Sequence, residues 1–118
     1  MPDTIPTVLR VKFFRSENGN EPVRNWLSEL SKASRKEIGT DVKTVQFGWP
    51  LGMPVVRKLE NGLWEVRTHL IGTIARIIFT VKGGEMVLLH GFIKKSQKTP
   101  AADLQVARHR KSSLGDAQ

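Results

Sequence analysis

The hydrophobic positions in the first third of the chain predict one strand followed by a helix. β-Forming residues dominate Thr7 to Arg15, so this segment is predicted to be a strand that ends in a turn over 16–19. A helix is predicted to begin at Asn20 or Glu21 with Pro22 in its first turn, where a missing N–H group costs little. Its apolar stripe, at i, i+3, i+4 and i+7, consists of Val23, Trp26, Leu27 and Leu30.

A second helix is predicted directly after the first. Ser34 and Glu37 match a capping box, in which the serine caps the helix and the glutamate stands three residues later. Gly48 and Pro50 are predicted to end the helix. The apolar positions at helical spacing are Ile38, Val42 and Val45.

Most of the remaining chain has the pattern of strands separated by tight turns. The predicted strands cover 55–60, 63–70, 73–82 and 85–93. Asn61-Gly62 is a strong two-residue hairpin signal, and further turns are predicted near Gly72 and at Gly83-Gly84. Thr99 is predicted to cap a final helix that has Pro100 at its first position.

The predicted element order is β-α-α-β-β-β-β-α, which lacks the regular alternation of a parallel βαβ fold. It predicts an α+β fold, with an antiparallel-rich sheet that carries the helical pair on one face. The 118 residues fit one domain. We therefore expect a single domain over 1–118, with loose ends at about 1–6 and 113–118.

The charge of the chain favours an acidic partner. The net charge is +8 and the pI is near 10.3, which suits RNA, DNA, an anionic membrane or an acidic protein. Basic residues concentrate in 94–111, where only Asp103 is acidic, whereas the first fifty residues nearly balance. A phosphate-facing surface is therefore expected to involve the C-terminal part, although a merely solvated basic surface would have the same composition.

Several kinds of chemistry find no support in the sequence. Cysteine is absent, which excludes disulfides and thiol catalysis and is compatible with a cytoplasmic location. We expect no signal peptide and no membrane partner, because no segment has the required apolar length. His69, His90 and His109 match no common metal spacing, and no P-loop, G-x-G-x-x-G or G-x-S-x-G motif is present. We therefore expect neither a metal nor a cofactor.

The strand over 63–70 places ionisable residues on one face. Because side chains alternate along a strand, one face carries Trp64, Val66, Thr68 and Leu70, and the other carries Leu63, Glu65, Arg67 and His69. Such a charged face is either solvated or lines a site. Arg76 lies in the apolar run over 73–79, where an unpartnered arginine would be very costly. Arg76 must therefore reach solvent, a carboxylate such as Glu65, or a ligand phosphate.

The last predicted strand adds a histidine and an aromatic ring to this face. Alternation predicts that Met86, Leu88, His90, Phe92 and Lys94 share one face. His90 and Lys94 would then join Arg67 and Arg76 on the side of the sheet away from the helical pair. Such a patch suits single-stranded RNA, because arginine grips phosphate and an aromatic ring stacks on a base. The alternatives are a solvated run of lysines and a core histidine bonded to the backbone.

Three segments resemble the successive motifs of RelE/HigB-type toxins, most closely the phage-derived HigB-like subgroup. They are L-W-E-V-R at 63–67, A-R-I at 75–77 and L-L-H-G-F-I-K-K-S-Q-K-T-P at 88–100. The resemblance covers about Val11 to Arg108. It implies an α+β fold in which helices cover one sheet face and the opposite, concave face binds RNA.

The resemblance also implies an activity and partners. Similar toxins cleave mRNA on the ribosome without metal, by attack of the substrate's own 2′-hydroxyl, and are silenced by an antitoxin, here expected to be a small helix-turn-helix protein. By position, the residues that resemble the basic active-site set are Arg67, Arg76, Lys94, Lys95 and Lys98. His90 is the candidate acid or base, since the ordinary pKa of histidine is near neutrality. Glu65, Phe92 and Arg108 are expected to contact RNA.

The chain departs from that pattern in one respect. Several RelE relatives use a tyrosine in the site, and this chain contains none. Proton transfer would then fall to His90, a lysine or Glu65. Two alternatives stay open: ParE-type relatives share the fold but inhibit DNA gyrase, and a non-catalytic basic regulator could bind nucleic acid without cutting it.

Overall fold

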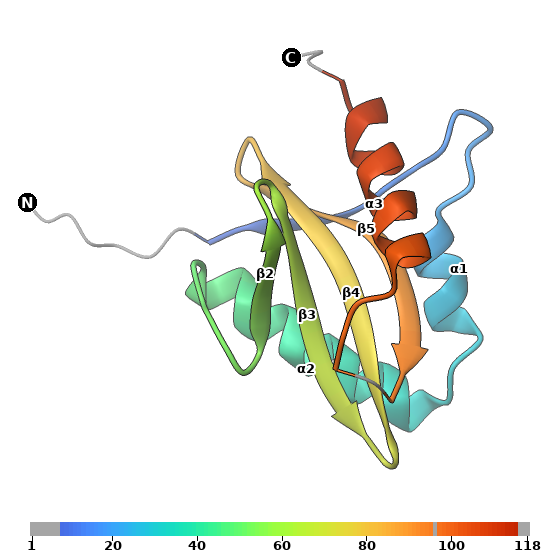
Figure 1. Ribbon diagram of the computed structural model, residues 1–118, viewed down its shortest axis with the longest axis vertical. Helices are drawn as coiled ribbons and strands as arrows, with labels where there is room; N and C mark the ends of the chain where they lie inside the picture. The colour runs from blue at the N-terminus through green and yellow to red at the C-terminus, as the bar shows by residue number, and fades with distance from the viewer. Residues whose placement is uncertain (1–7, 96, 116–118) are drawn as a thin grey trace, which may run out of the picture.

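The computed structural model describes residues 8–95 and 97–115 (Figure 1). The elements are β1 (Arg10–Phe13), α1 (Pro22–Ser28), α2 (Lys32–Gly48), β2 (Val56–Glu60), β3 (Leu63–Leu70), β4 (Thr73–Lys82), β5 (Glu85–Lys94) and α3 (Ala101–Ser113). This confirms the predicted order β-α-α-β-β-β-β-α. Among the residues described, no helix is both long and apolar enough to cross a membrane.

The five strands form one sheet in the order β1-β5-β4-β3-β2. Strand β1 pairs with β5 in parallel. The pairs β2–β3, β3–β4 and β4–β5 are antiparallel, as the short turns between them require. The helices α1 and α2 lie on one face of the sheet, and α3 crosses the other face (Figure 1). The predicted α+β fold with a helical pair on one face is therefore confirmed.

Each face of the sheet has its own hydrophobic cluster. The larger cluster joins α1 and α2 to the sheet, with Val23, Ile38 and Val45 packed against strand residues such as Ile77 and Phe79. The smaller cluster lies under α3. Its buried members are Phe14, Leu63, Ile78, Val87, Leu89, Phe92 and Ala107. Because α3 covers only part of this second face, polar side chains of β2, β3, β4 and β5 have room beside it.

Two helix starts differ from the sequence prediction. The residue that caps α2 is Ser31, whose side chain accepts a hydrogen bond from the backbone N–H of Ser34 at 3.1 Å. The prediction that Ser34 is the cap was wrong, because the helix begins one turn earlier at Lys32. At α3 the backbone of Pro100 is extended and occupies the cap position, so Thr99 does not cap the helix as predicted.

The chain ends are partly described. The strand predicted over 7–15 is confined to Arg10–Phe13, although the N–H of Phe14 still bonds to the carbonyl of Leu88 at 3.0 Å. Ser113 ends α3 and Leu114 packs against the smaller cluster, so any loose C-terminal end begins after them. The predicted loose segments at 1–6 and 116–118 lie outside the described residues.

A β-bulge in β2 and another in β5 shift the strand registers away from simple alternation. In the β4–β5 pair, Phe79 faces Leu88 but Ile78 faces His90, so Leu89 is the extra residue. Met86 and Leu88 therefore belong to the α1/α2 cluster. The predicted common face of Met86 through Lys94 was wrong in its first half, because a bulge inserts one residue and turns the later side chains to the opposite face. His90 and Phe92 are directed to the α3 side.

Gly91 on β5 makes room for the ring of Trp26 from α1. A Cβ atom added at Gly91 would lie 2.6 Å from Cζ3 of Trp26, closer than real side-chain contacts allow. We predict that Gly91→Ala lowers the free energy of unfolding by about 1–3 kcal/mol, the usual cost of overpacking. Urea denaturation checks this, with Gly39→Ala, at an exposed open position on α2, as the matched control. Equal effects of the two substitutions would contradict the packing role.

Candidate active site

The strand registers assemble polar side chains in rows on the α3 side of the sheet. The first row across β2, β3, β4 and β5 is Arg57, Glu65, Ile78 and His90. The second row across β3, β4 and β5 is Arg67, Arg76 and Phe92, and the third is His69, Ile74 and Lys94. The structure therefore places six of the predicted site residues on one face: Glu65, Arg67, Arg76, His90, Phe92 and Lys94.

A buried ion-pair network lies at the centre of these rows. Glu65 and Arg76 are fully buried and Arg67 is 6% exposed. Glu65 Oε1 lies 3.7 Å from Arg67 Nε and 3.9 Å from Arg76 Nη1. Burial lowers the pKa of Arg76, and the nearby carboxylate of Glu65 opposes that shift. The carboxylate alternative considered for Arg76 is therefore present in the structure.

The segment between β5 and α3 covers this network. The carbonyl of Gln97 accepts hydrogen bonds from Arg57 at 2.9 Å and from Arg76 at 3.1 Å, and its side-chain oxygen accepts one from Arg67 at 2.6 Å. The hydroxyl of Thr99 donates to Glu65 Oε2 at 2.8 Å. In Figure 1 the chain before α3 passes in front of the sheet at this point. Each of the three guanidinium groups thus already donates a hydrogen bond to an oxygen atom of Gln97.

The network is positively charged and incompletely bonded. Arg57, Arg67 and Arg76 face one carboxylate, that of Glu65. Among the described residues, Arg67 Nε, Arg76 Nε, Arg76 Nη2 and Glu65 Oε1 have no hydrogen-bond partner. Unpaired buried donors are costly, and they are retained where a water molecule, an ion or a function requires them. An excess of cationic donors just beneath a surface suits an anionic ligand above it.

His90 forms a separate polar pair beside the network. Its Nε2 lies 2.7 Å from Asp103 Oδ1, in the first turn of α3, and both side chains are about one fifth exposed. The His90 ring also stacks on Phe92, with ring centroids 5.5 Å apart and 24° between the planes. A carboxylate at Nε2 favours the tautomer with the proton there, because the carboxylate can only accept. The Nδ1 atom then carries the lone pair and can take a proton.

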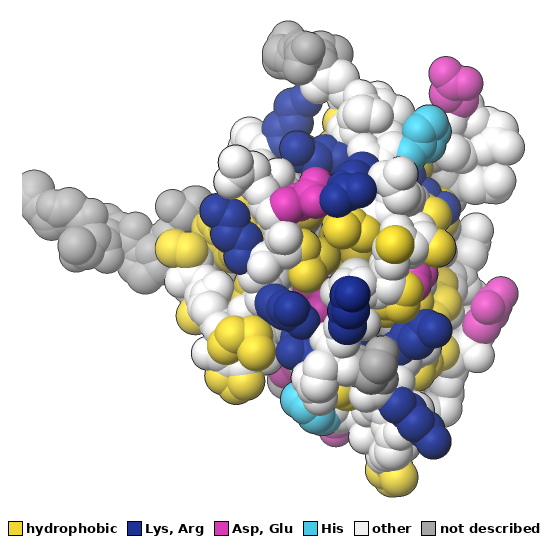
Figure 2. All heavy atoms as spheres, in the orientation of Figure 1, with side chains coloured by type: hydrophobic (Ala, Val, Ile, Leu, Met, Phe, Trp, Pro, Cys, Tyr) yellow, Lys and Arg dark blue, Asp and Glu magenta, His cyan; other side chains and the backbone are white. Residues whose placement is uncertain are grey.

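The predicted lysines lie at the rim and Arg108 lies elsewhere. Lys94, Lys95 and Lys98 are exposed at the end of β5 and just after it. Figure 2 shows the α3 face, where Lys and Arg side chains gather around the segment that precedes this helix. Arg108 projects from α3 toward β2 and binds Glu60 with Nη2 2.7 Å from Oε1. The Arg108 hydrogen bond lowers the pKa of Glu60, and the structure does not bring Arg108 to the network.

The hydroxyl of Thr99 donates to the buried carboxylate of Glu65, a role that the capping prediction missed. We predict that Thr99→Val lowers the free energy of unfolding by about 1–3 kcal/mol, because a buried carboxylate loses its donor. Thr99→Ser keeps the hydroxyl and is expected to retain most of the stability. Thr99→Asp separates the two roles, since aspartate caps helices well but would repel Glu65. Thermal unfolding of the three variants checks this, and stabilisation by Thr99→Asp would favour capping after all.

Sequence reasoning missed three residues of this site: Arg57, Gln97 and Asp103. An ideal hairpin at Asn61-Gly62 would put Lys58 opposite Glu65, and the bulge at Leu59 places Arg57 there instead. Asp103 carried a weak signal, as an acid in the first turn of the predicted last helix. Gln97 carried none, because its contacts depend on the path of an irregular segment.

The family model for phage derived protein Gp49-like matches residues 25–112, which is most of the chain and includes every residue of the rows described above. No curated protein matches the chain. Within the described residues, no three His, Asp or Glu side chains are grouped as they would be around a metal ion.

Proposed function

We propose, from the premise that this chain belongs to the phage-derived Gp49-like family of RelE/HigB-like toxins, that it is an mRNA-cleaving toxin. It acts as a single domain of the HigB-like subgroup and cleaves mRNA on the ribosome in the cytoplasm. The 2′-hydroxyl of the substrate attacks the adjacent phosphorus, so a 2′-O–P bond forms and the P–O5′ bond breaks. The products carry a 2′,3′-cyclic phosphate and a 5′-hydroxyl, and we expect no metal to be needed.

The observation that carries the proposal is that two different polar groups lie on the same face of the sheet. The Arg57/Arg67/Arg76 group supplies excess positive charge, and the His90–Asp103 pair supplies a proton acceptor held in one tautomer. Cleavage by a 2′-hydroxyl needs both: a base for the hydroxyl proton and cations for the phosphorane charge. A gyrase inhibitor or a passive binding module needs no oriented histidine.

Each group has a proposed role. His90 Nδ1 takes the proton of the 2′-hydroxyl, while Phe92, which is buried under α3 and, contrary to the prediction, does not present a ring face to RNA, supports the imidazole ring by stacking on it. Lys94, Lys95 and Lys98 neutralise the scissile and flanking phosphates from the rim. With no tyrosine in the chain, proton transfer to the leaving oxygen falls to one of these lysines.

Arg76 acts from beneath the surface. Gln97 separates the buried guanidinium from solvent, so direct contact between Arg76 and a phosphate would require that the Gln97 carbonyl move away. As the residues stand, Arg76 stabilises anionic charge through its field, which is strong where water is excluded. Arg57 is the half-buried member of the group and the one that a phosphate reaches first.

The toxin assignment implies a partner. Family membership suggests an antitoxin, and we propose that it is a small helix-turn-helix protein encoded beside this chain. The basic surface fits an acidic or partly acidic inhibitor. Co-expression of the neighbouring gene is expected to restore growth and to yield a complex that co-purifies.

Expression in bacteria tests the proposed function against its alternatives. Translated messages are expected to acquire discrete new 5′ ends, while plasmid supercoiling stays normal. Intact messages with failed gyrase-dependent supercoiling would instead assign the chain to the ParE type, and normal growth with neither change would leave only a binding module. In a purified reaction, cleavage lost to chelator and restored by one particular divalent ion, with ribosomes intact, would overturn the metal-free mechanism.

A further inference from the structure

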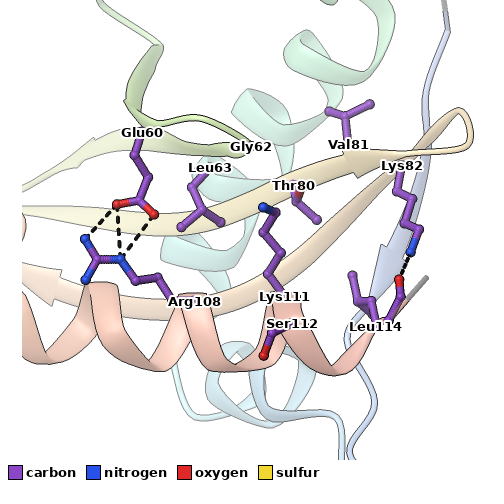
Figure 3. Close-up of a pocket in the computed structure, with 11 residues that line it drawn as sticks. Glu60, Gly62, Leu63, Thr80, Val81, Lys82, Arg108, Lys111, Ser112 and Leu114 are labelled. Carbon is purple, nitrogen blue, oxygen red and sulfur yellow. Dashed lines mark hydrogen bonds and ion pairs between the residues drawn. The ribbon is translucent and has the colours of Figure 1, made fainter. Parts of the chain in front are cut away.

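A basic cavity separate from the candidate active site lies between the β2–β3 hairpin and the C-terminal half of α3 (Figure 3). Its volume is about 560 Å³. Its polar walls come from Glu60, Thr80, Lys82, Arg108, Lys111 and Ser112. None of these is a member of the rows that form the candidate active site.

The three cations of this cavity exceed its acidic groups. Arg108 is bound by Glu60, whose two oxygens both accept from the guanidinium group. Lys111 makes no hydrogen bond or ion pair with any residue in the described part of the chain, and its ammonium group lies against Gly62 at the hairpin turn. Lys82 donates to the backbone carbonyl of Gly115 (Figure 3). Among the described residues that line the cavity, Glu60 is therefore the one carboxylate for three cations, and both Arg108 and Lys111 lower its pKa.

The end of α3 accounts for only part of this excess, because Lys111 is in its last turn and Lys82 donates to the carbonyl of Gly115 just after it. The C-terminus of a helix carries the equivalent of about half a negative charge, which favours basic residues in the last turn. The last turn of α3 contains Arg110 and Lys111, and Arg110 is directed to β5, where it donates to the carbonyl of Leu89 at 2.8 Å. Half a negative charge is less than the two net positive charges that Lys82, Lys111, Arg108 and Glu60 give the cavity lining. An anion bound in the cavity would neutralise the remainder.

We infer that this cavity binds a phosphate group of an RNA strand, at a point separate from the cleavage site. Thr80 and Lys82 continue the face of β4 that carries Arg76 and Ile78. At about 3.3 Å per residue, Lys82 lies roughly 20 Å along the strand from Arg76. An RNA held at both places is fixed in direction as well as position. The inference rests on the proposed function insofar as RNA is the substrate.

The RNA at this cavity is either the message or ribosomal RNA. The test variant is Lys82→Ala/Lys111→Ala, and the matched control is Lys36→Ala/Lys43→Ala, which removes two exposed lysines from α2 on the other face. Unchanged thermal unfolding verifies that each variant is folded. A charge-conserving variant, Lys82→Arg/Lys111→Arg, is expected to bind RNA as the unmodified protein does.

The measurement is affinity against salt for a short 2′-O-methyl oligoribonucleotide and for purified ribosomes. The oligonucleotide cannot be cleaved, so the result does not depend on catalysis. The slope of log affinity against log salt is expected to shrink by about 0.7 for each lost phosphate contact. Loss with the oligonucleotide identifies the message, and loss confined to ribosomes identifies ribosomal RNA.

Two results would overturn the inference. In the first, the test and control variants bind both RNA probes equally well. In the second, the test variant keeps both RNA affinities but loses binding to the antitoxin, which would assign the cavity to an acidic protein segment. If the proposed function itself is wrong, the result is different: the unaltered protein does not cut an unmodified message on ribosomes.

Discussion

Arg76→Ala is expected to lower the free energy of unfolding by about 3–5 kcal/mol, because it takes from the buried Glu65 one of its two guanidinium neighbours and leaves a cavity in the sheet face. Glu65 is fully buried 3.9 Å from Arg76, and the carbonyl of Gln97 loses one of its two donors. A small domain has only about 5–15 kcal/mol of stability in total. The variant is therefore expected to be strongly destabilised, and any folded fraction is expected to lose toxicity.

A double-mutant cycle separates the two effects of Arg76. Glu65→Leu/Arg76→Met removes both charges and keeps the side-chain volumes similar, so part of the stability is expected to return, the remainder being lost because Arg67 and Thr99 also lose their contacts with Glu65. Toxicity is expected to stay below that of the unmodified protein, because Arg57 and Arg67 remain but the Arg76 guanidinium at the centre of the network is gone. Urea denaturation and growth assays measure the two properties. A stable and fully toxic Arg76→Ala would contradict both roles, and a stable double variant with full toxicity would contradict the catalytic one.

The sequence alone leaves two roles open for Arg76. An arginine in an apolar strand could be a phosphate ligand whose removal leaves folding nearly intact, or half of an ion pair with Glu65. The structure contains the ion pair, and it also places Arg76 beside two more arginines under a covering segment. Arg76→Lys keeps the charge but loses the planar fork. Partial activity of that variant would indicate a role through charge alone.

His90→Gln is expected to slow cleavage by about 10²–10⁴-fold, the usual contribution of a positioned base. Glutamine can still hydrogen-bond Asp103, so only a small loss of stability is expected. The matched control is His109→Gln on the exposed part of α3, which is expected to keep full activity. Addition of imidazole to His90→Ala is expected to restore part of the rate, an effect that a purely structural histidine would not show.

Asp103 is the positioning residue for His90. Asp103→Asn can present a donor to Nε2 and so favour the tautomer with its proton on Nδ1, where the base must be free. Its cleavage rate is expected to approach that of His90→Gln, while Asp103→Glu recovers part of it. Full activity of Asp103→Asn, with folding unchanged, would contradict this assignment of the base.

The strands could be predicted closely because period-two patterns and paired turn residues are local signals. Strands β3 and β4 have the predicted bounds, and the turns lie at Asn61-Gly62 and Gly83-Gly84 as expected. The face of Glu65 and Arg67 followed from alternation alone. Helix starts were less certain, since Ser31 and Ser34 are both good caps and tertiary packing selects between them.

The site was only half predictable because bulges and an irregular segment complete it. Arg57 reaches Glu65 through the bulge at Leu59, and His90 turns to the α3 side through the bulge at Leu89. Simple alternation put His90 on the correct face, but it put Met86 and Leu88 there too. Because of the bulge, those two side chains point to the other face. The contacts of Gln97 and Thr99 depend on how 97–100 crosses the sheet, which no local pattern encodes.

The most direct test of the central claim is cleavage of a message that lacks a single 2′-hydroxyl. Ribosomes are programmed with an mRNA cut by this protein, and the nucleotide 5′ of the mapped break is replaced by its 2′-deoxy counterpart. The account predicts that cleavage at that bond disappears while other sites are still cut, and that the unmodified message yields a 2′,3′-cyclic phosphate. Undiminished cleavage at the deoxy position would contradict attack by the 2′-hydroxyl.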